Sequence, residues 1–518
     1  MNGAQALIRT LSDAGVEVCF TNPGTSEMHF VAALDSVPEM RAILALFEGV
    51  ATGAADGYAR MTGKPAGTLL HLGPGLGNGI ANLHNARRAK VPMVNIVGDH
   101  ATYHKQYDAP LESDIDALAS NVSGWVHRTL RPGDVAADAA AAVAASLQPP
   151  GQVATLILPA DVSWLDATGP AKPITPALPA LVPDDRIAAV ADVIRSGEPT
   201  VLLLGGRVML EQGLRAAARI AAATGVKVLA ETFPTRTERG AGLPAVERIG
   251  YLAEFAQMQL DGAAHVVLVD TVDPVSFFAY PGKASVLRPE DSNVHVLAGG
   301  TDDAVTALEA LADLLGAGAD PLTTAAARPE RPTGALDAQS AAAAIGALLP
   351  EGAIVADEAQ TSGLFISGAT QGCPRHDWLT LTGGAIGIGL PLATGAAVAC
   401  PDRKVLCLEA DGSTMYTPQA LWTQVRESLD VTTVVFNNGS YAILNLELSR
   451  VGAEEIGPVA KSMLDLHGPD LDFVALANSM GVQATRATTA EEFTTQLEAA
   501  LNNEGPHLID AVVPPLGL

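Results

Sequence analysis

Two polar groups in the last third of the chain have the composition of a metal site. The apolar segment KVLCLEA leads into Asp411, and the next apolar segment, VTTVVF, leads into Asn437-Asn438-Gly439. If both segments are parallel strands, their carboxyl ends share the edge at which open α/β sheets bind ligands. Asp411 and Asn438 offer oxygen ligands of the kind that Mg²⁺ prefers, and Gly439 lets the loop turn so that a backbone carbonyl can join them.

The residues after Asp411 suit a phosphorylated ligand. Gly412 and Ser413 lead into a predicted helix, and the free amides at a helix N-terminus bind phosphate well. Mg²⁺ usually completes its coordination with phosphate oxygens and water, so the metal and the phosphate groups fit one site. Each piece alone is also ordinary turn chemistry, because Asp-Gly and Asn-Asn-Gly are common in turns.

Near the N-terminus, Glu48 follows the apolar run LALF and begins the predicted helix of GVATGAADGYARMTG. A lone carboxylate in an apolar stretch is costly unless it has a partner or a chemical role. The structural alternative is a first-turn charge, which the helix dipole stabilises.

His71 ends the predicted strand GTLLH and faces a predicted Gly-rich loop, GPGLGNG. Its imidazole is suited to moving protons near neutral pH, and a purely structural histidine is the alternative. Asn22, in the sequence Asn-Pro-Gly, is either a turn residue or a site residue.

Apolar runs that alternate with Ala-rich stretches must position these side chains. In the first part of the chain, helices are expected over Val50–Met61 and Gly79–Ala89. Such alternation predicts a parallel sheet covered by helices on both faces. The strands predicted here are Val16–Phe20, Gly67–His71, Val91–Val97 and Val153–Leu158.

Two Pro-rich segments divide the chain into three units of this kind. Their composition is typical of linkers, and their sequences are DATGPAKPITPALPALVPDD and GAGADPLTTAAARPERPTG. We therefore predict three doubly wound α/β domains at residues 1–165, 185–316 and 335–518, each around a parallel sheet. The other predicted strands are Thr200–Gly205, Lys227–Glu231, His265–Asp270 and Asn293–Leu297 in the central domain, and Ala353–Ala356, Val405–Glu409, Thr432–Phe436 and His507–Val512 in the third.

These motifs resemble those of the thiamine-diphosphate-dependent 2-oxo acid decarboxylase and carboligase family, which includes benzoylformate decarboxylase and acetolactate synthase. The groups at Asp411 and Asn438 are similar to its Gly-Asp-Gly and Asn-Asn motif, with Ala410 in place of the first glycine. A methyl group is tolerable there if the backbone is not at positive φ. Glu48 to Arg60 resembles the family signature E-x-x-A-x-x-x-A-x-G-Y-A-R, and TNPGTSE, HLGPGLGN and TGGAIGIGLP extend the resemblance along nearly the whole chain.

The resemblance implies that the third domain binds the diphosphate and Mg²⁺. The ligands of Mg²⁺ would be Asp411, Asn438 and the backbone carbonyl of Ser440, and Gly412 and Ser413 would meet the diphosphate.

The first domain would then bind the pyrimidine ring of thiamine diphosphate. Glu48 would bond to the ring and favour its imino tautomer. The carbonyl of Gly384 would receive the amino group of the cofactor, and Ile386 would force the cofactor into a V shape. Because the family builds each site from two subunits, the resemblance also implies a homodimer or homotetramer.

The same resemblance suggests a substrate pocket. His71 corresponds to a catalytic histidine of benzoylformate decarboxylase, and Thr25 to its substrate-binding serine. Ile443, Leu444 and Glu447 would line the pocket from a short helix, although the two aliphatic residues could also be core. Glu447 replaces an aromatic residue, which suggests a small aliphatic substrate with a polar group at Glu447, or an acid role for this residue.

Two departures from the relatives leave the substrate undefined. Benzoylformate decarboxylase has a second catalytic histidine in the stretch that matches VSFFAYPG, which contains none. Acetolactate synthases have a glutamine in the loop after VPMVNIVGD, where this chain has Pro110 or Leu111, with Gln106 only nearby.

The overall composition limits the partners. The chain has 518 residues and a formal net charge of −26, which disfavours nucleic acid and anionic membranes. No apolar stretch reaches the roughly 20 residues that a spanning helix needs, and no signal peptide is predicted, so we expect a cytoplasmic protein. Rossmann, Walker and zinc patterns do not match.

We therefore predict an enzyme that uses thiamine diphosphate and Mg²⁺ to decarboxylate a small-molecule 2-oxo acid and join the product to a carbonyl acceptor. The alternatives are a decarboxylase that releases an aldehyde, a 2-hydroxyacyl-CoA lyase and a catalytically silent subunit. Only Ala410 favours the last.

Overall fold

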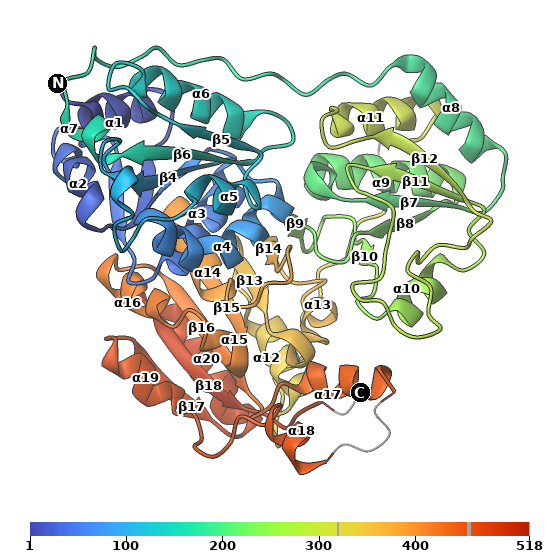
Figure 1. Cartoon of the computed structure of the whole chain (residues 1–518). Helices are drawn as coiled ribbons and strands as arrows, with labels where there is room; N and C mark the ends of the chain where they lie inside the picture. Colours follow the sequence, from blue (N-terminus) through green and yellow to red (C-terminus); the bar gives the residue numbers. More distant parts are fainter. Residues whose placement is uncertain (319–320, 453–456, 517–518) are drawn as a thin grey trace.

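The computed structural model describes residues 1–318, 321–452 and 457–516, arranged around three sheets (Figure 1). The first sheet has the strand order β2-β1-β3-β4-β6-β5, and all of its neighbouring strands are parallel. Its strands are β1 (Val18–Asn22), β2 (Arg41–Leu44), β3 (Ala66–Leu70), β4 (Met93–Asp99), β5 (Trp125–Arg128) and β6 (Val153–Pro159).

Helices cover both faces of the first sheet because its strands are apolar on both sides. Along β1, Val18 and Phe20 belong to the core under α3 and α4, whereas Cys19 belongs to the core under α1 and α6. The elements are α1 (Gly3–Asp13), η1 (Thr25–Glu27), α2 (Met28–Leu34), α3 (Glu48–Thr62), α4 (Leu72–Ala89), η2 (Lys105–Tyr107), α5 (Ile115–Ser120), α6 (Val135–Leu147) and α7 (Ala160–Trp164).

After a long extended segment (Figure 1), the chain forms the central sheet, which is entirely parallel with the order β10-β8-β7-β11-β12. Its strands are β7 (Thr200–Leu204), β8 (Lys227–Ala230), β10 (Glu247–Arg248), β11 (His265–Val269) and β12 (Asn293–Ala298). Its helices are α8 (Asp184–Arg195), η3 (Gly206–Met209), α9 (Glu211–Thr224), α10 (Ala253–Leu260) and α11 (Ala304–Leu314).

The third sheet has the order β17-β18-β16-β15-β13-β14-β9. Its strands are β13 (Ile354–Glu358), β14 (His376–Thr380), β15 (Val405–Ala410), β16 (Val431–Asn437), β17 (Gln483–Ala487), β18 (His507–Val512) and the edge strand β9 (Arg236–Arg239). Its helices are α12 (Ala338–Leu348), η4 (Gln360–Gly363), α13 (Ile366–Ala369), α14 (Gly389–Ala399), α15 (Asp411–Thr414), α16 (Gln419–Arg426), α17 (Ala442–Arg450), α18 (Pro458–Ser462), α19 (Phe473–Ser479) and α20 (Ala490–Asn502).

The predicted α/β class with parallel sheets is confirmed, with one difference at the edge of the third sheet. Strand β9 comes from the chain between β8 and β10 and pairs antiparallel to β14. Its Arg239 lies over the ring of Trp378 at 4.8 Å, and Arg236 bonds Asp377 at 2.6 Å. The sequence RTER has no apolar run, so pattern alone did not reveal a strand. The predicted domain boundaries stay predictions.

The first and third domains pack through α3 and α14, which approach at backbone distance. A Cβ atom on Gly57 would lie 2.1 Å from the carbonyl of Leu392, and one on Gly395 would lie 1.8 Å from that of Ala54. Only glycine allows this approach, and one apolar core therefore continues across both domains.

Arg60 stabilises the packing of the first domain on the third through buried hydrogen bonds. It forms two bonds with Asp56, at 2.8 and 2.7 Å, and both side chains are fully buried. It also donates to the carbonyls of Thr380 and Thr235, at 2.7 and 3.2 Å, and so connects α3 to the third sheet and to the segment before β9.

Most predicted strands lie within about two residues of the observed ones, but the Gly-rich loop after His71 was wrong. Helix α4 begins at Leu72 and includes the glycines. Three of them allow close packing rather than a turn: a Cβ on Gly73 would lie 1.9 Å from Ser113 Oγ, one on Gly75 would lie 3.2 Å from Glu48 Oε1, and one on Gly79 would lie 3.0 Å from the side chain of Thr52. Across the described ranges, the helices are too short or too polar to span a membrane.

Candidate active site

The carboxylate of Asp411 organises the loop that was predicted to bind Mg²⁺. Asp411 follows β15 and begins α15, and its Oδ2 accepts the backbone N–H of Asn438 at 3.0 Å and of Gly439 at 2.7 Å. Its Oδ1 accepts the N–H of Gly412 at 2.8 Å. Burial raises the pKa of Asp411, and these amides oppose the shift. A bound cation would favour the ionised carboxylate further.

The donor set of this loop fits Mg²⁺. Gly439 has φ of +65°, which turns the chain after Asn438, and the amide of Ser440 donates to Asn438 Oδ1 at 2.9 Å. The described residues contain no group of three or more His, Cys, Asp or Glu side chains that could hold a metal. A cation here would therefore use one carboxylate with amide and carbonyl oxygens, which leaves positions for phosphate and water.

The backbone at position 410 accepts the alanine that replaces the first glycine of the family motif. Its backbone has φ of −84° and ψ of 153°, an extended conformation open to any residue. Gly412, in contrast, cannot carry a side chain, because a Cβ there would lie 2.3 Å from the ring of Tyr441. The hydroxyl of Ser413 donates to Glu409 at 2.8 Å, so the backbone of this short helix is left to face a diphosphate.

The loop with Gly384 and Ile386 is held from the first domain. Asn85 donates to the carbonyl of Ala385 at 2.8 Å and accepts its amide at 3.2 Å. His84 bonds the carbonyl of Gly383 at 3.0 Å. Gly384 has φ of +77°, and Ile386 is partly buried against the shared core. Hydrogen bonds from the first domain therefore fix the backbone of this loop.

From the third domain the same loop is held by a buried carboxylate. Glu358 accepts the amides of Gly387 and Gly389, at 2.8 and 2.7 Å. It lies opposite Glu409 across strands β13 and β15. Burial raises the pKa of Glu358 to about 7, and burial together with Glu358 raises the pKa of Glu409 well above its ordinary value. Both carboxyl groups therefore favour the protonated form more than an exposed glutamate does. The sequence analysis missed both residues.

Glu48 lies at the start of α3 and is buried. Its Oε2 accepts a hydrogen bond from Asn78 at 3.0 Å. Gly75 leaves room beside it, since a Cβ there would lie 3.2 Å from Glu48 Oε1. Asn82 joins this region to the loop of the third domain by donating to the carbonyls of Gly49 and Gly387, at 2.8 and 3.3 Å.

His71 has a carboxylate partner that the sequence did not reveal. Its Nδ1 lies 2.8 Å from Oε2 of Glu27, whose side chain is fully buried. Gly24 makes room, because a Cβ there would lie 2.2 Å from the imidazole, and its amide donates to Glu27 at 2.8 Å. Burial raises the pKa of Glu27, and His71 opposes the shift. Thr25, beside Gly24, is exposed in this chain.

The predicted substrate helix is α17, which is at most half-buried along its length. Ile443 is partly buried and Leu444 is 44% exposed. Glu447 accepts a hydrogen bond from Tyr280, a residue of the central domain. Tyr280 belongs to the stretch VSFFAYPG, so this segment does reach the helix although it carries no histidine.

The fold thus gathers the predicted residues into two groups. Glu48, His71 and Thr25 lie at the strand ends of the first sheet, and Asp411, Asn438 and Ser440 lie at those of the third. Within the described ranges, no hydrogen bond joins the two groups directly.

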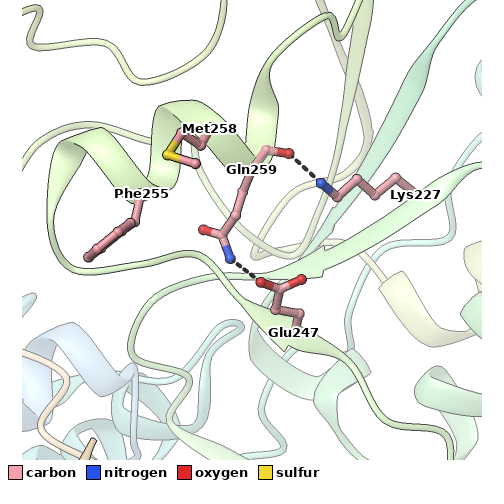
Figure 2. Close-up of a pocket in the computed structure, with 5 residues that line it drawn as sticks. All are labelled: Lys227, Glu247, Phe255, Met258 and Gln259. Atoms are coloured by element: carbon pink, nitrogen blue, oxygen red, sulfur yellow. Dashed lines mark hydrogen bonds between the residues drawn. The ribbon is translucent and has the colours of Figure 1, made fainter.

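A separate hollow of about 430 Å³ opens on the central domain (Figure 2). Gln259 crosses it by donating to Glu247 at 2.6 Å, and Lys227 donates to the Gln259 carbonyl at 2.6 Å. Phe255 and Met258 project from α10 beside this hollow. The hollow shares no lining residue with the predicted site.

Comparisons with known proteins agree with this arrangement. Residues 1–120 match the N-terminal thiamine pyrophosphate binding domain of thiamine pyrophosphate enzymes, and residues 367–511 match the C-terminal one. IlvX of Mycobacterium tuberculosis, provisionally named acetolactate synthase large subunit, is 63% identical, and the alignment covers 100% of both chains. Benzoylformate decarboxylase of Pseudomonas aeruginosa is 30% identical, with 96% of each chain covered.

A solved structure has the same fold. The thiamine diphosphate-dependent 4-hydroxybenzoylformate decarboxylase of Rhodococcus jostii superimposes with a TM-score of 0.87 over 100% of both chains, at 24% identity. The three-domain arrangement is therefore shared along the whole length.

Proposed function

The chain belongs to the thiamine pyrophosphate enzyme family, and from this premise we propose that it uses thiamine diphosphate and Mg²⁺ to decarboxylate a 2-oxo acid and join the remaining carbon unit to a carbonyl acceptor. The single observation that carries the proposal is the loop around Asp411. Its carboxylate fixes the amides of Asn438 and Gly439, and the backbone at Ala410 removes the one objection to a working site. Thiamine diphosphate supplies the electron sink for the decarboxylation.

We assign the binding of Mg²⁺ to Asp411, Asn438 and the carbonyl of Ser440, and the binding of the diphosphate to Gly412 and Ser413. A hard cation with oxygen ligands and phosphate suits these groups. In this proposal residues 335–518 form the diphosphate-binding domain and residues 1–165 the pyrimidine-binding domain, with residues 185–316 between them.

Glu48 would hold the pyrimidine ring through its carboxylate, and Gly384 and Ile386 would fix the shape of the cofactor. The loop of these last two residues is held by Asn85 and Glu358, so it is preorganised for that role.

His71 and Glu27 would move a proton at the substrate. The carboxylate orients the imidazole through Nδ1, which leaves Nε2 to act as acid or base. Thr25 would contact the substrate carboxylate. This pair also favours a second candidate, simple decarboxylation with release of an aldehyde, because that outcome ends in proton transfer.

We further propose a cytoplasmic homodimer or homotetramer in which the two groups of residues come from different subunits. No hydrogen bond joins the two groups within the described part of one chain, which supports this arrangement. Light scattering of the purified protein would test it, and a monomer with full activity would contradict it.

The reaction is tested by incubating the protein with thiamine diphosphate, Mg²⁺ and pyruvate or 2-oxobutyrate. We expect release of CO₂ and an acyloin or acetohydroxy acid, identified by mass spectrometry. Free aldehyde alone would select the second candidate. No CO₂ from any 2-oxo acid, despite bound cofactor, would contradict both.

A further inference from the structure

A polar cluster joins the central domain to the helix that follows the metal loop. The phenol of Tyr280 donates a hydrogen bond to Oε2 of Glu447. The guanidinium of Arg450 lies 4.5 Å from the centre of the Tyr280 ring, and its Nε lies 3.5 Å from the same carboxylate oxygen. Glu447 is therefore fixed by the central domain and by its own helix.

The outer part of the cluster holds Arg450 in place. Arg450 Nη1 lies 2.9 Å from Glu254 on α10, and Lys283 lies 3.2 Å from the same carboxylate. Two carboxylates and two cations balance, so the cluster is neutral as a whole. Because Arg450 is anchored to Glu254, the carboxylate of Glu447 is held in one orientation.

One oxygen of this carboxylate is left without a partner. Glu447 Oε1 is buried, and no donor among the described residues reaches it. A buried acceptor without a hydrogen bond is costly, and such groups in folded proteins need an explanation. Its other oxygen already accepts a hydrogen bond from Tyr280. The Nε of Arg450 is also buried without a partner, but it faces that other oxygen, at 3.5 Å. A donor for Oε1 is therefore left for a ligand to supply.

The surroundings of Glu447 are aromatic. Tyr251 lies near enough that Glu447, after burial, helps to raise the pKa of its phenol to about 12. Phe277 packs against Tyr251 and Phe233 with ring centres 5.1 and 5.4 Å apart. An apolar wall next to a single acceptor is the composition of a pocket that recognises one polar group on an apolar body.

The cluster also lies beside the metal loop. Helix α17 follows Ser440 directly and contacts η4. Asn438 in turn donates to Ser362 of η4 at 3.4 Å. Ile443 and Leu444 lie on the same side of α17 as Glu447, by their spacing along the helix.

We propose that Glu447 and Tyr280 form the far end of the substrate pocket and select 2-oxo acids whose side chain ends in a hydrogen-bond donor, either a hydroxyl or an ammonium group. The proposal rests on the proposed 2-oxo acid reaction and names its substrate class. A site built to bond a donor rejects the analogue that lacks it, because the buried acceptor then stays unpaired.

The test compares kcat/KM of the holoenzyme for phenylglyoxylates that carry hydrogen, methyl, hydroxyl or aminomethyl at the para position. The methyl compound matches the hydroxyl in size but donates no hydrogen bond. We expect at least about a 10-fold preference for a donor-bearing acid over the methyl one. The hydroxyl and aminomethyl compounds decide which donor is preferred, and equal values for all four acids would overturn the proposal.

Variants test the two residues. Glu447→Gln should abolish a preference for the ammonium group and reduce one for the hydroxyl, and Tyr280→Phe should reduce either preference. Lys283→Gln removes an exposed ion pair of the same cluster and serves as the matched control. A preference that survives Glu447→Gln unchanged would contradict the assignment.

Binding gives a readout that does not need turnover. Calorimetric titration of the four acids into the holoenzyme should show the same order, and melting temperatures show whether each variant is folded. If no 2-oxo acid releases CO₂ but the binding preference persists, the proposed reaction fails and the polar pocket stands. If CO₂ is released without any preference, the reaction stands and the pocket fails.

Discussion

The third and central sheets present similar crevices that have been used differently. In each, the strand order reverses beside the first strand, between β13 and β15 or between β7 and β11, and such reversals are where open sheets bind ligands. Each crevice holds buried carboxylates that accept backbone amides. In the third sheet, Asp411 orders the loop of Asn438 and Gly439 by accepting both of their amides.

In the central sheet, carboxylates fill the place of a ligand. Asp270 accepts the amide of Arg207 at 2.8 Å, and Glu231 accepts that of Gly206 at 3.3 Å. A Cβ on Gly206 would lie 2.0 Å from Asp270. Phosphate groups of nucleotides bind to such amides after a first strand. We infer that the crevice is closed by the protein's own charges, so the same topology supports a site only where the carboxylate leaves room.

The most severe test of this difference is a pair of matched substitutions. Asp411→Asn should lower kcat/KM at least about 100-fold and weaken Mg²⁺-dependent cofactor retention, since the proposed function makes this carboxylate a ligand of Mg²⁺. Asp270→Asn should leave both close to the parent values. Steady-state kinetics and equilibrium dialysis with thiamine diphosphate measure the two effects. Similar losses in both variants would contradict the proposed difference between the third and central sheets.

A second substitution asks whether the first sheet contributes chemistry or only binding. Glu48→Gln should lower kcat by roughly 100-fold or more, because a proton acceptor is removed. Cofactor retention should remain, since the amide keeps the shape of the side chain. Dialysis against metal-free buffer separates the two quantities, and unchanged turnover would exclude the assigned role.

The pair of His71 and Glu27 should act as one unit. His71→Ala and Glu27→Gln are each expected to lower kcat about 10- to 100-fold, with the double variant no worse than the His71 variant. A double-mutant cycle measures this coupling. Additive losses would show that Glu27 serves the fold rather than the imidazole.

The smallest expected effect concerns the closed crevice. Burial raises the pKa of Glu231, so the folded protein favours the neutral carboxyl. Its contribution to stability is complete below the ordinary pKa of the carboxyl and is lost as pH rises through the raised value in the folded protein. Glu231→Gln should therefore lessen the fall in melting temperature between pH 5 and pH 8. Calorimetry at both pH values checks this, and an identical fall in the variant would contradict it.

The features that could be predicted from the sequence are those that depend on residues close together along the chain. Apolar runs located the strands, and the polar residues after KVLCLEA and VTTVVF were sufficient to place Asp411 and Asn438 at one sheet edge. The α/β class and the cofactor family are confirmed. The roles assigned to individual site residues stay predictions.

Contacts between distant segments were not predictable in this way. Glu27 ends the short helix η1, and nothing local shows that it is buried against His71. Glu358 and Glu409 read as strand ends until the register brings them together. The glycines after His71 indicated a loop because their packing partners, such as Ser113, are remote in sequence.

The close approach of α3 and α14 has a consequence for folding during synthesis of the protein. On the small-residue face of α3, Gly57 is covered by Leu392 and Ala396, and Gly53 is covered by Pro391 together with Asn82 of α4. During synthesis from the N-terminus, the first sheet is therefore complete long before the residues of α14 that pack on this face of α3 are made. Thr380, whose carbonyl accepts a hydrogen bond from Arg60, is also made only later. Partly folded chains with uncovered apolar surface aggregate readily. Until α14 is made, the first domain therefore exposes the face of α3 at Gly57.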